Sequence, residues 1–89
     1  MISREFKISN RLGLHARPSA QLTQVASRFH SEVFITRDGR RVNAKSIMGV
    51  MMLAAGPGST VSVEADGLDE ESAVAAIGAR IESRFGEDH

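Results

Sequence analysis

A histidine, an arginine and a proline lie close together at the expected start of a helix, within residues 13–18. Proline is favoured in a first helical turn, where its missing N–H would have no intrahelical partner. His15 and Arg17 would then lie beside unpaired backbone N–H groups and the positive end of the helix dipole, which together attract a dianion. A neutral imidazole there can attack phosphorus, while the N–H groups and the guanidinium hold the phosphoryl oxygens. Taken alone, the same residues would also suit a surface histidine beside a solvated arginine, because short motifs match by accident.

A second motif, residues 43–53, predicts a helix of about two turns with Ser46 as its N-cap. Serine is a favoured N-cap, so an isolated Ser46 would be interpreted as structural. The helix is apolar nearly all round, and a helix this short over a small sheet cannot bury every face. Val50 and Leu53 are expected in the core. An exposed patch suited to several partner surfaces is expected from Ile47, Met48 and Met51.

Together the two segments resemble the HPr family, the histidine-containing phosphocarriers of the bacterial phosphoenolpyruvate-dependent phosphotransferase system. The resemblance covers nearly the whole chain, with both motifs in the family's spacing. It implies that His15 accepts the phosphoryl group through Nδ1, as a pros-phosphohistidine, and that Arg17 stabilises the phosphate. Ser46 corresponds to the serine that a dedicated kinase, HPr kinase/phosphorylase, modifies in many bacteria.

The resemblance also implies partners. Enzyme I would load His15, and the group would pass to enzyme IIA domains, so the chain is expected to be a stoichiometric carrier without a cofactor, not a free-standing enzyme. Partners would dock on the apolar patch and the exposed side of the first helix, which comprises Ala16, Arg17, Ala20, Gln21 and Gln24. One position departs from many sugar-branch relatives, which have Ser or Asn where this chain has Leu12. Asn10 is a candidate substitute for the missing hydrogen bond near the phosphate.

Length and composition indicate a single small domain, residues 1–89, with 42% hydrophobic residues. The charges of eleven basic and eleven acidic residues cancel, which argues against binding to nucleic acid or to an anionic membrane. The only aromatic residues of the Phe, Tyr and Trp types are four Phe, which leaves few side chains to stack on bases. The absence of cysteine excludes disulfides and thiolate metal sites, and three widely separated histidines predict no metal site. Without a signal peptide or a membrane-spanning run, we expect a cytoplasmic monomer.

Alternation of apolar and polar residues predicts four strands, over residues 2–9, 32–36, 41–43 and 60–65. Helical apolar stripes predict a helix from 16 to about 29 and a last helix that Asp69 caps and that buries Phe85. Asp38 and Gly39 predict a hairpin turn. The order βαββαβα indicates an α+β fold, an HPr-like open-faced β-sandwich. A four-stranded antiparallel sheet would carry three helices on one face.

Rival hypotheses remain. Residues 10–13 and the acidic end, residues 85–88, resemble the regulatory nitrogen-related branch of the family, whereas residues 46–51 resemble sugar carriers under kinase control. A protein of a different class, a regulatory interaction module acting through phosphorylated Ser46, would lack the active histidine, and His15 is present. An anion- or nucleic-acid-binding domain is opposed by the zero net charge and the few aromatic residues.

Overall fold

The four predicted strands form one antiparallel sheet in the order β1-β4-β2-β3. In the computed structural model, which describes residues 1–86, they are β1 (Ile2–Lys7), β2 (Glu32–Arg37), β3 (Arg40–Asn43) and β4 (Thr60–Asp66). Phe6 pairs with Val61 across β1 and β4, and Val63 pairs with Ile35 across β4 and β2. The first and last strands of the chain are therefore neighbours. Residues 87–88 of the expected acidic end lie outside the described residues.

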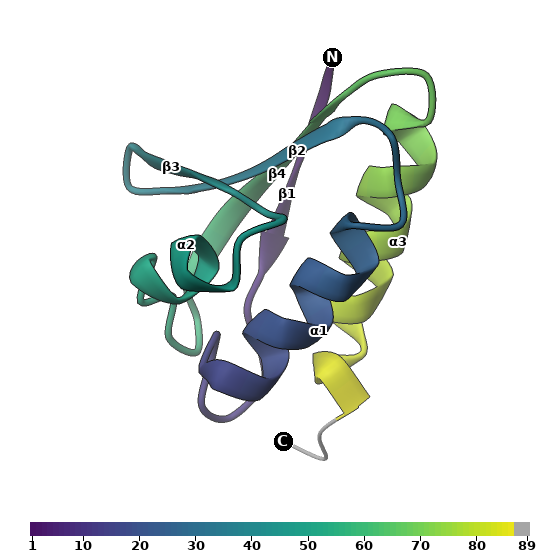
Figure 1. Ribbon diagram of the computed structural model, residues 1–89. Coiled ribbons are helices and arrows are strands. Elements are labelled where there is room, and N and C mark those ends of the chain that lie inside the picture. Colours follow the sequence, from purple (N-terminus) through teal and green to yellow (C-terminus); the bar gives the residue numbers. More distant parts are fainter. Residues whose placement is uncertain (87–89) are drawn as a thin grey trace.

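Three helices cover one face of this sheet, which confirms the predicted α+β open-faced sandwich (Figure 1). They are α1 (Ala16–Ala26), α2 (Ile47–Met52) and α3 (Glu70–Glu82), and a short 3-10 turn, η1 (Arg84–Gly86), follows. In Figure 1, α1 and α3 run side by side in opposite directions. The short α2 packs against α1 and β3.

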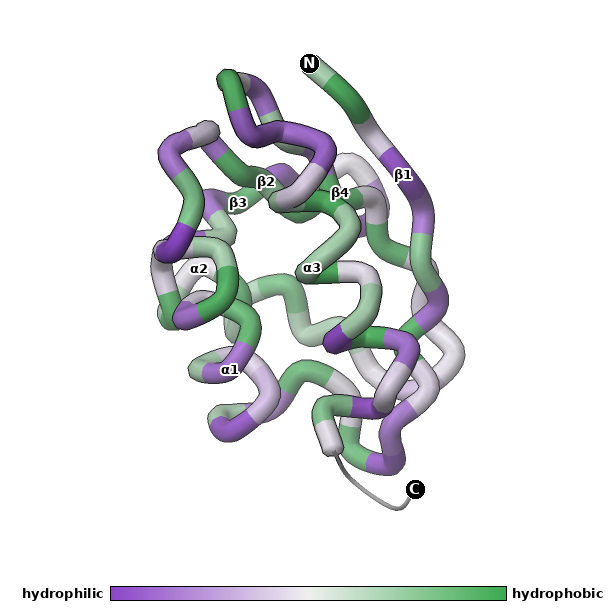
Figure 2. Tube along the Cα trace, turned by 90° about the vertical axis from the view of Figure 1, so that its right-hand side faces the viewer, coloured by the Kyte–Doolittle hydropathy of each residue, from purple (hydrophilic) through white to green (hydrophobic). Residues whose placement is uncertain are grey.

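The hydrophobic core lies between the sheet and the helices. Figure 2 shows hydrophobic stretches along the two central strands, β2 and β4. The buried residues of these strands are Val33, Ile35, Val61, Val63 and Ala65. The α3 helix approaches β1 closely at Gly78, where an added Cβ would overlap the ring of Phe6. The predicted stripe is buried, but α3 ends at Glu82, so Phe85 packs into the core from η1, where its φ is +55°, and not from the helix itself. The buried members of the stripe on α3 include Val74, Ile77 and Ile81.

The end of α1 differs from the prediction, because the helix ends at Ala26 and not near residue 29. The N–H groups of Arg28 and Phe29 bond to carbonyls three residues back, at 3.1 and 3.2 Å, which tightens the chain into 3-10 geometry. Phe29 still packs against the core as a partly buried side chain. The predicted stripe therefore correctly identified the buried face but not the helix boundary.

The β2–β3 connection has the backbone that its sequence predicted. Asp38 and Gly39 both have positive φ, 50° and 79°, as a two-residue hairpin turn requires. Among the described residues, no helix is long and apolar enough to cross a membrane. Residues 1–86 also contain no cluster of three or more potential metal-ligating His, Cys, Asp or Glu side chains.

Candidate functional site

His15 is the N-cap residue of α1, with extended backbone (φ −82°, ψ −169°), and its side chain is partly exposed. Its carbonyl accepts the N–H of Ser19 at 3.0 Å, which begins the helical pattern, but its side chain makes no capping hydrogen bond. By position, the N–H groups of Ala16 and Arg17 have no intrahelical acceptor. The imidazole therefore lies where the sequence predicted, at the electropositive end of the helix.

The first turn of α1 has the charge and shape that suit an anion. Pro18 is fully buried in this turn and anchors it to the core, whereas Ala16 and Arg17 are exposed. The turn contains no acidic residue. A guanidinium on the surface and helix-end N–H groups next to an imidazole can together hold three phosphoryl oxygens.

The connection that precedes His15 is fastened to the α2–β4 connection. Gly13 has φ +68°, and a Cβ there would overlap the carbonyl oxygen of Ala55 and the backbone of Gly56. The N–H of Leu14 donates to the Ala55 carbonyl at 2.9 Å. Only glycine allows this close approach in that conformation, so Gly13 sets the direction from which the chain reaches His15.

Asn10 and Ser19, the buried polar residues near His15, are both fully buried. The Asn10 amide donates to the Gly13 carbonyl at 2.8 Å, and the Ser19 hydroxyl donates to the Leu14 carbonyl at 3.2 Å. The prediction that Asn10 replaces a hydrogen bond to the phosphate is wrong in that form, because its amide lies in the interior. Sequence reasoning missed Ser19, although it shares the buried face of α1 with Leu22. Leu12, by contrast, is 65% exposed.

Both ends of α2 are held by side chains. Ser46 is the predicted N-cap, and its Oγ accepts the N–H of Gly49 at 3.1 Å. At the other end, Arg40 donates to the carbonyl of Met52 at 2.9 Å and Arg37 to that of Leu53 at 3.1 Å. Cations at a helix C-terminus also interact favourably with the dipole. The two arginines were not predicted, because they approach from the β2–β3 hairpin.

The exposed surface of α2 is apolar, as expected. Val50 and Leu53 are buried, and the outer side chains are Ile47 (43% exposed), Met48 (69%), Met51 (39%) and Met52 (61%). We call these four residues the α2 patch. On α1, the predicted docking residues Ala16, Arg17 and Gln24 are exposed, and Ala20 and Gln21 are half-buried. Because α1 and α2 pack together, the two surfaces are neighbours.

A separate polar network lies at the other end of α1. Asp69 occupies the N-cap position of α3, as predicted, but its side chain makes no capping hydrogen bond to this helix. The carboxylate accepts the N–H groups of His30 and Ser31, both at 2.9 Å, and the Ser31 hydroxyl at 2.5 Å. The Ser31 hydroxyl, followed by the His30 N–H, lowers the pKa of Asp69 to about 2. Asp69 therefore joins the β4–α3 connection to the α1–β2 connection.

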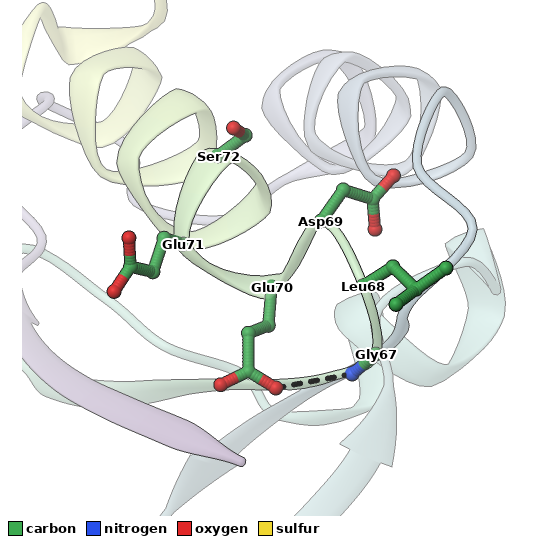
Figure 3. Close-up of a pocket in the computed structure, with 6 residues that line it drawn as sticks. All are labelled: Gly67, Leu68, Asp69, Glu70, Glu71 and Ser72. Carbon is green, nitrogen blue, oxygen red and sulfur yellow. Dashed lines mark hydrogen bonds between the residues drawn. The ribbon is translucent and has the colours of Figure 1, made fainter.

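A hollow of about 410 Å³ lies beside Asp69 and is lined by residues 67–72 (Figure 3). The side chain of Glu70 turns back to accept the Gly67 N–H at 3.2 Å, which lowers the pKa of this carboxyl. Three of the lining residues carry carboxylates, Asp69, Glu70 and Glu71. This negative charge makes the hollow unsuitable for a phosphate.

A four-stranded sandwich with a histidine at the start of its first helix defines the class of small α+β phosphocarriers. The family described as "PTS HPr component phosphorylation site" matches residues 2–83. The phosphocarrier protein HPr of Cupriavidus necator is 61% identical over 87 residues, 98% of each chain. The HPr-like protein Crh of Bacillus subtilis is 43% identical over 92% of this chain and 96% of its own. The crystal structure of HPr-C-His from Thermoanaerobacter tengcongensis superposes with a TM-score of 0.97, at 46% identity over the whole of both chains. The chain belongs to the HPr family of phosphocarriers of the phosphotransferase system.

Proposed function

We propose that His15 accepts a phosphoryl group from phosphorylated enzyme I and passes it to a histidine of an enzyme IIA domain. The observation that carries this proposal is the position of His15 at the N-cap of α1, directly before a first helical turn that has helix-end N–H groups and the exposed Arg17. Each transfer forms one N–P bond at the acceptor as the N–P bond of the donor breaks. Arg17 and the N–H groups stabilise the phosphoryl oxygens and take no part in bond formation.

The partners of this carrier dock on the α2 patch and on the exposed side of α1. Support for this surface comes from the exposure of Met48 and Met51 on α2, which packs against α1, the helix that begins after His15. Exposed methionines form an adaptable apolar surface. All the proposed site residues belong to one chain, so one domain can carry the group, and we propose that it works as a monomer without a cofactor. We also propose a cytoplasmic location, where enzyme I would load it.

Ser46 is the proposed site of regulation by an HPr kinase/phosphorylase. Its hydroxyl is at the exposed N-terminus of α2, where a phosphate would be compatible with the helix dipole. The phosphate would add almost two negative charges next to Met48, and these charges would lose solvent when enzyme I docks. A phosphoserine at this position should therefore slow the loading of His15, which stopped-flow transfer from enzyme I would measure. Equal loading rates for the phosphorylated and unmodified proteins would contradict this regulation.

The central test is incubation with phosphoenolpyruvate and enzyme I, followed by mass measurement. The protein should gain one acid-labile phosphoryl group, and His15→Ala should fold normally but gain none. His30→Ala is the matched control, because His30 lies at the opposite end of α1 beside Asp69, and this variant should be loaded normally. Normal labelling of His15→Ala would refute the proposal.

The same test separates the carrier from a regulatory module that acts through phosphorylated Ser46, because only the carrier is loaded by enzyme I. The relatives named above favour the carrier, since the identity to HPr of Cupriavidus necator exceeds that to Crh. A role in the nitrogen-related branch would use the same His15 chemistry with a different enzyme IIA partner. Transfer to enzyme IIA domains of each branch distinguishes these roles.

A further inference from the structure

Gly13 and Leu14 directly precede His15, so their backbone carbonyls are neighbours along the chain of the proposed phosphorylation site. A carbonyl oxygen has a partial negative charge, so one that turned outward at this helix end would oppose a dianion. Each of the two carbonyls instead accepts a hydrogen bond from a fully buried side chain. Asn10 donates to the Gly13 carbonyl at 2.8 Å, and Ser19 donates to the Leu14 carbonyl at 3.2 Å.

For the Leu14 carbonyl, the chain offers no backbone donor in the helical position. The residue four positions further on is Pro18, which has no N–H. The Ser19 hydroxyl supplies a donor in its place, while the Ser19 N–H bonds to the carbonyl of His15 at 3.0 Å. Ser19 therefore donates a hydrogen bond to the carbonyl of Leu14 through its hydroxyl and to the carbonyl of His15 through its N–H.

The Gly13 carbonyl is the second group that is turned inward. It accepts the Asn10 amide and also the N–H of His15, at 3.0 Å. The N–H of Gly13 in turn donates to the Asn10 carbonyl at 3.2 Å, so backbone and side chain of Asn10 close the same turn. This turn leads directly to His15, and its geometry decides which backbone groups face the end of α1.

We propose that Asn10 and Ser19 are positioning residues for phosphoryl transfer. They hold the carbonyls of Gly13 and Leu14 in the interior, so that the end of α1 presents donors to the phosphoryl group. The inference rests on the proposed function of His15. It differs from a purely structural role because it assigns the two side chains an effect on the rate of transfer.

The test compares Ser19→Ala with Ser31→Ala. Ser31 is also a buried serine, 2% exposed, and its hydroxyl bonds to Asp69 at the other end of α1. Both variants lose one buried hydroxyl and the hydrogen bond that it makes, but only Ser19→Ala releases a carbonyl next to His15. Asn10→Ala is the second variant at the site. Loading by phosphorylated enzyme I is measured at a temperature where circular dichroism shows every compared variant to be folded.

We expect Ser19→Ala and Asn10→Ala to lower the kcat of loading by about fivefold with KM unchanged, because the docking surface is intact. Ser31→Ala should have the same kcat as the wild-type protein, even though it should unfold at a lower urea concentration than the wild-type protein. A kcat for Ser19→Ala equal to that of Ser31→Ala would overturn the inference. If Asn10→Ala does not fold, the two serine variants decide the question. If phosphorylated enzyme I did not phosphorylate the wild-type protein, the proposed function itself would be refuted. Failure of the inference and failure of the proposed function therefore give different results.

Discussion

The charge available to a phosphoryl group at His15 comes from one side chain and from the backbone. Arg17 is the exposed cation in the first turn of α1, and no acidic residue in that turn opposes it. The backbone contributes N–H groups that are fixed by the fold and need no reorganisation when the phosphate arrives. Since the backbone contribution does not depend on Arg17, loss of Arg17 should weaken the site without abolishing it.

Arg17→Ala should therefore still be phosphorylated by enzyme I, but about tenfold more slowly. A charge-assisted hydrogen bond is worth about 1.5–3 kcal/mol, and the exposure of Arg17 places its effect at the low end of that range. Rapid-quench measurement of loading checks this. Arg28→Ala removes an exposed arginine beyond the other end of α1 and serves as the control. Equal loading rates for the two variants would show that Arg17 does not stabilise the phosphate.

At the scale of an element, α2 is a six-residue helix that owes its position to its neighbours. A helix of this length is not stable alone. Ser46 holds its N-terminus, and Arg37 and Arg40 bond to carbonyls at its C-terminus. Val50 fixes the buried side. Met48 is 69% exposed and takes no part in these contacts, so a change at Met48 should affect binding more than stability.

Met48→Asp should raise the KM of loading by enzyme I by about tenfold and leave kcat unchanged. An aspartate in the first turn of α2 is compatible with the helix dipole, so the free energy of unfolding should change by less than about 0.5 kcal/mol. Urea titration and steady-state kinetics measure the two effects. Leu68→Asp makes a similar change on a fully exposed leucine in the remote hollow. If both variants had the same KM, the α2 patch would not be the docking surface.

At the scale of the whole molecule, the two ends of α1 serve different purposes. The N-terminal end carries His15, and the residues after its C-terminal end are tied to α3 through Asp69. A further hydrogen bond to these residues comes from Lys45, whose ammonium donates to the Phe29 carbonyl at 2.9 Å. The α1–β2 connection is thus held by the β3–α2 connection, through Lys45, and by the start of α3, through Asp69. The carboxylate in this network makes global stability dependent on pH.

The stability of the protein should fall in acid through Asp69. Its pKa is lowered from 3.8 to about 2 in the folded state, so its stabilising effect is complete above the unfolded value and is lost as the pH falls through about 2. Asp69→Asn should be less stable at neutral pH, and its deficit should shrink over that acid range. Urea unfolding at successive pH values measures both curves. Parallel curves would contradict this assignment, and Glu71→Gln, which changes an exposed carboxylate in the same hollow, is the control.

The sequence by itself determined the features that depend on neighbours along the chain. Alternation located the strands, helical stripes located the buried faces, and the positions of His15, Pro18 and Ser46 located two helix starts. These are local signals, because side-chain direction follows the period of the backbone and capping involves residues within one turn. The fold class and the elements of the candidate site could therefore be predicted before any tertiary contact was known.

The tertiary structure alone decided which distant groups meet. Asn10 was a candidate for a hydrogen bond near the phosphate, but it is buried and donates to the Gly13 carbonyl. Asp69 was expected to cap its own helix, but its carboxylate accepts the N–H of Ser31, 38 positions away. The arginines that hold α2 come from a hairpin 12 and 16 positions earlier. A polar side chain can satisfy its hydrogen bonds locally or across the fold, and the choice depends on which elements pack beside it. That packing arises from burial of the shared core, so no local pattern around these residues encodes their partners.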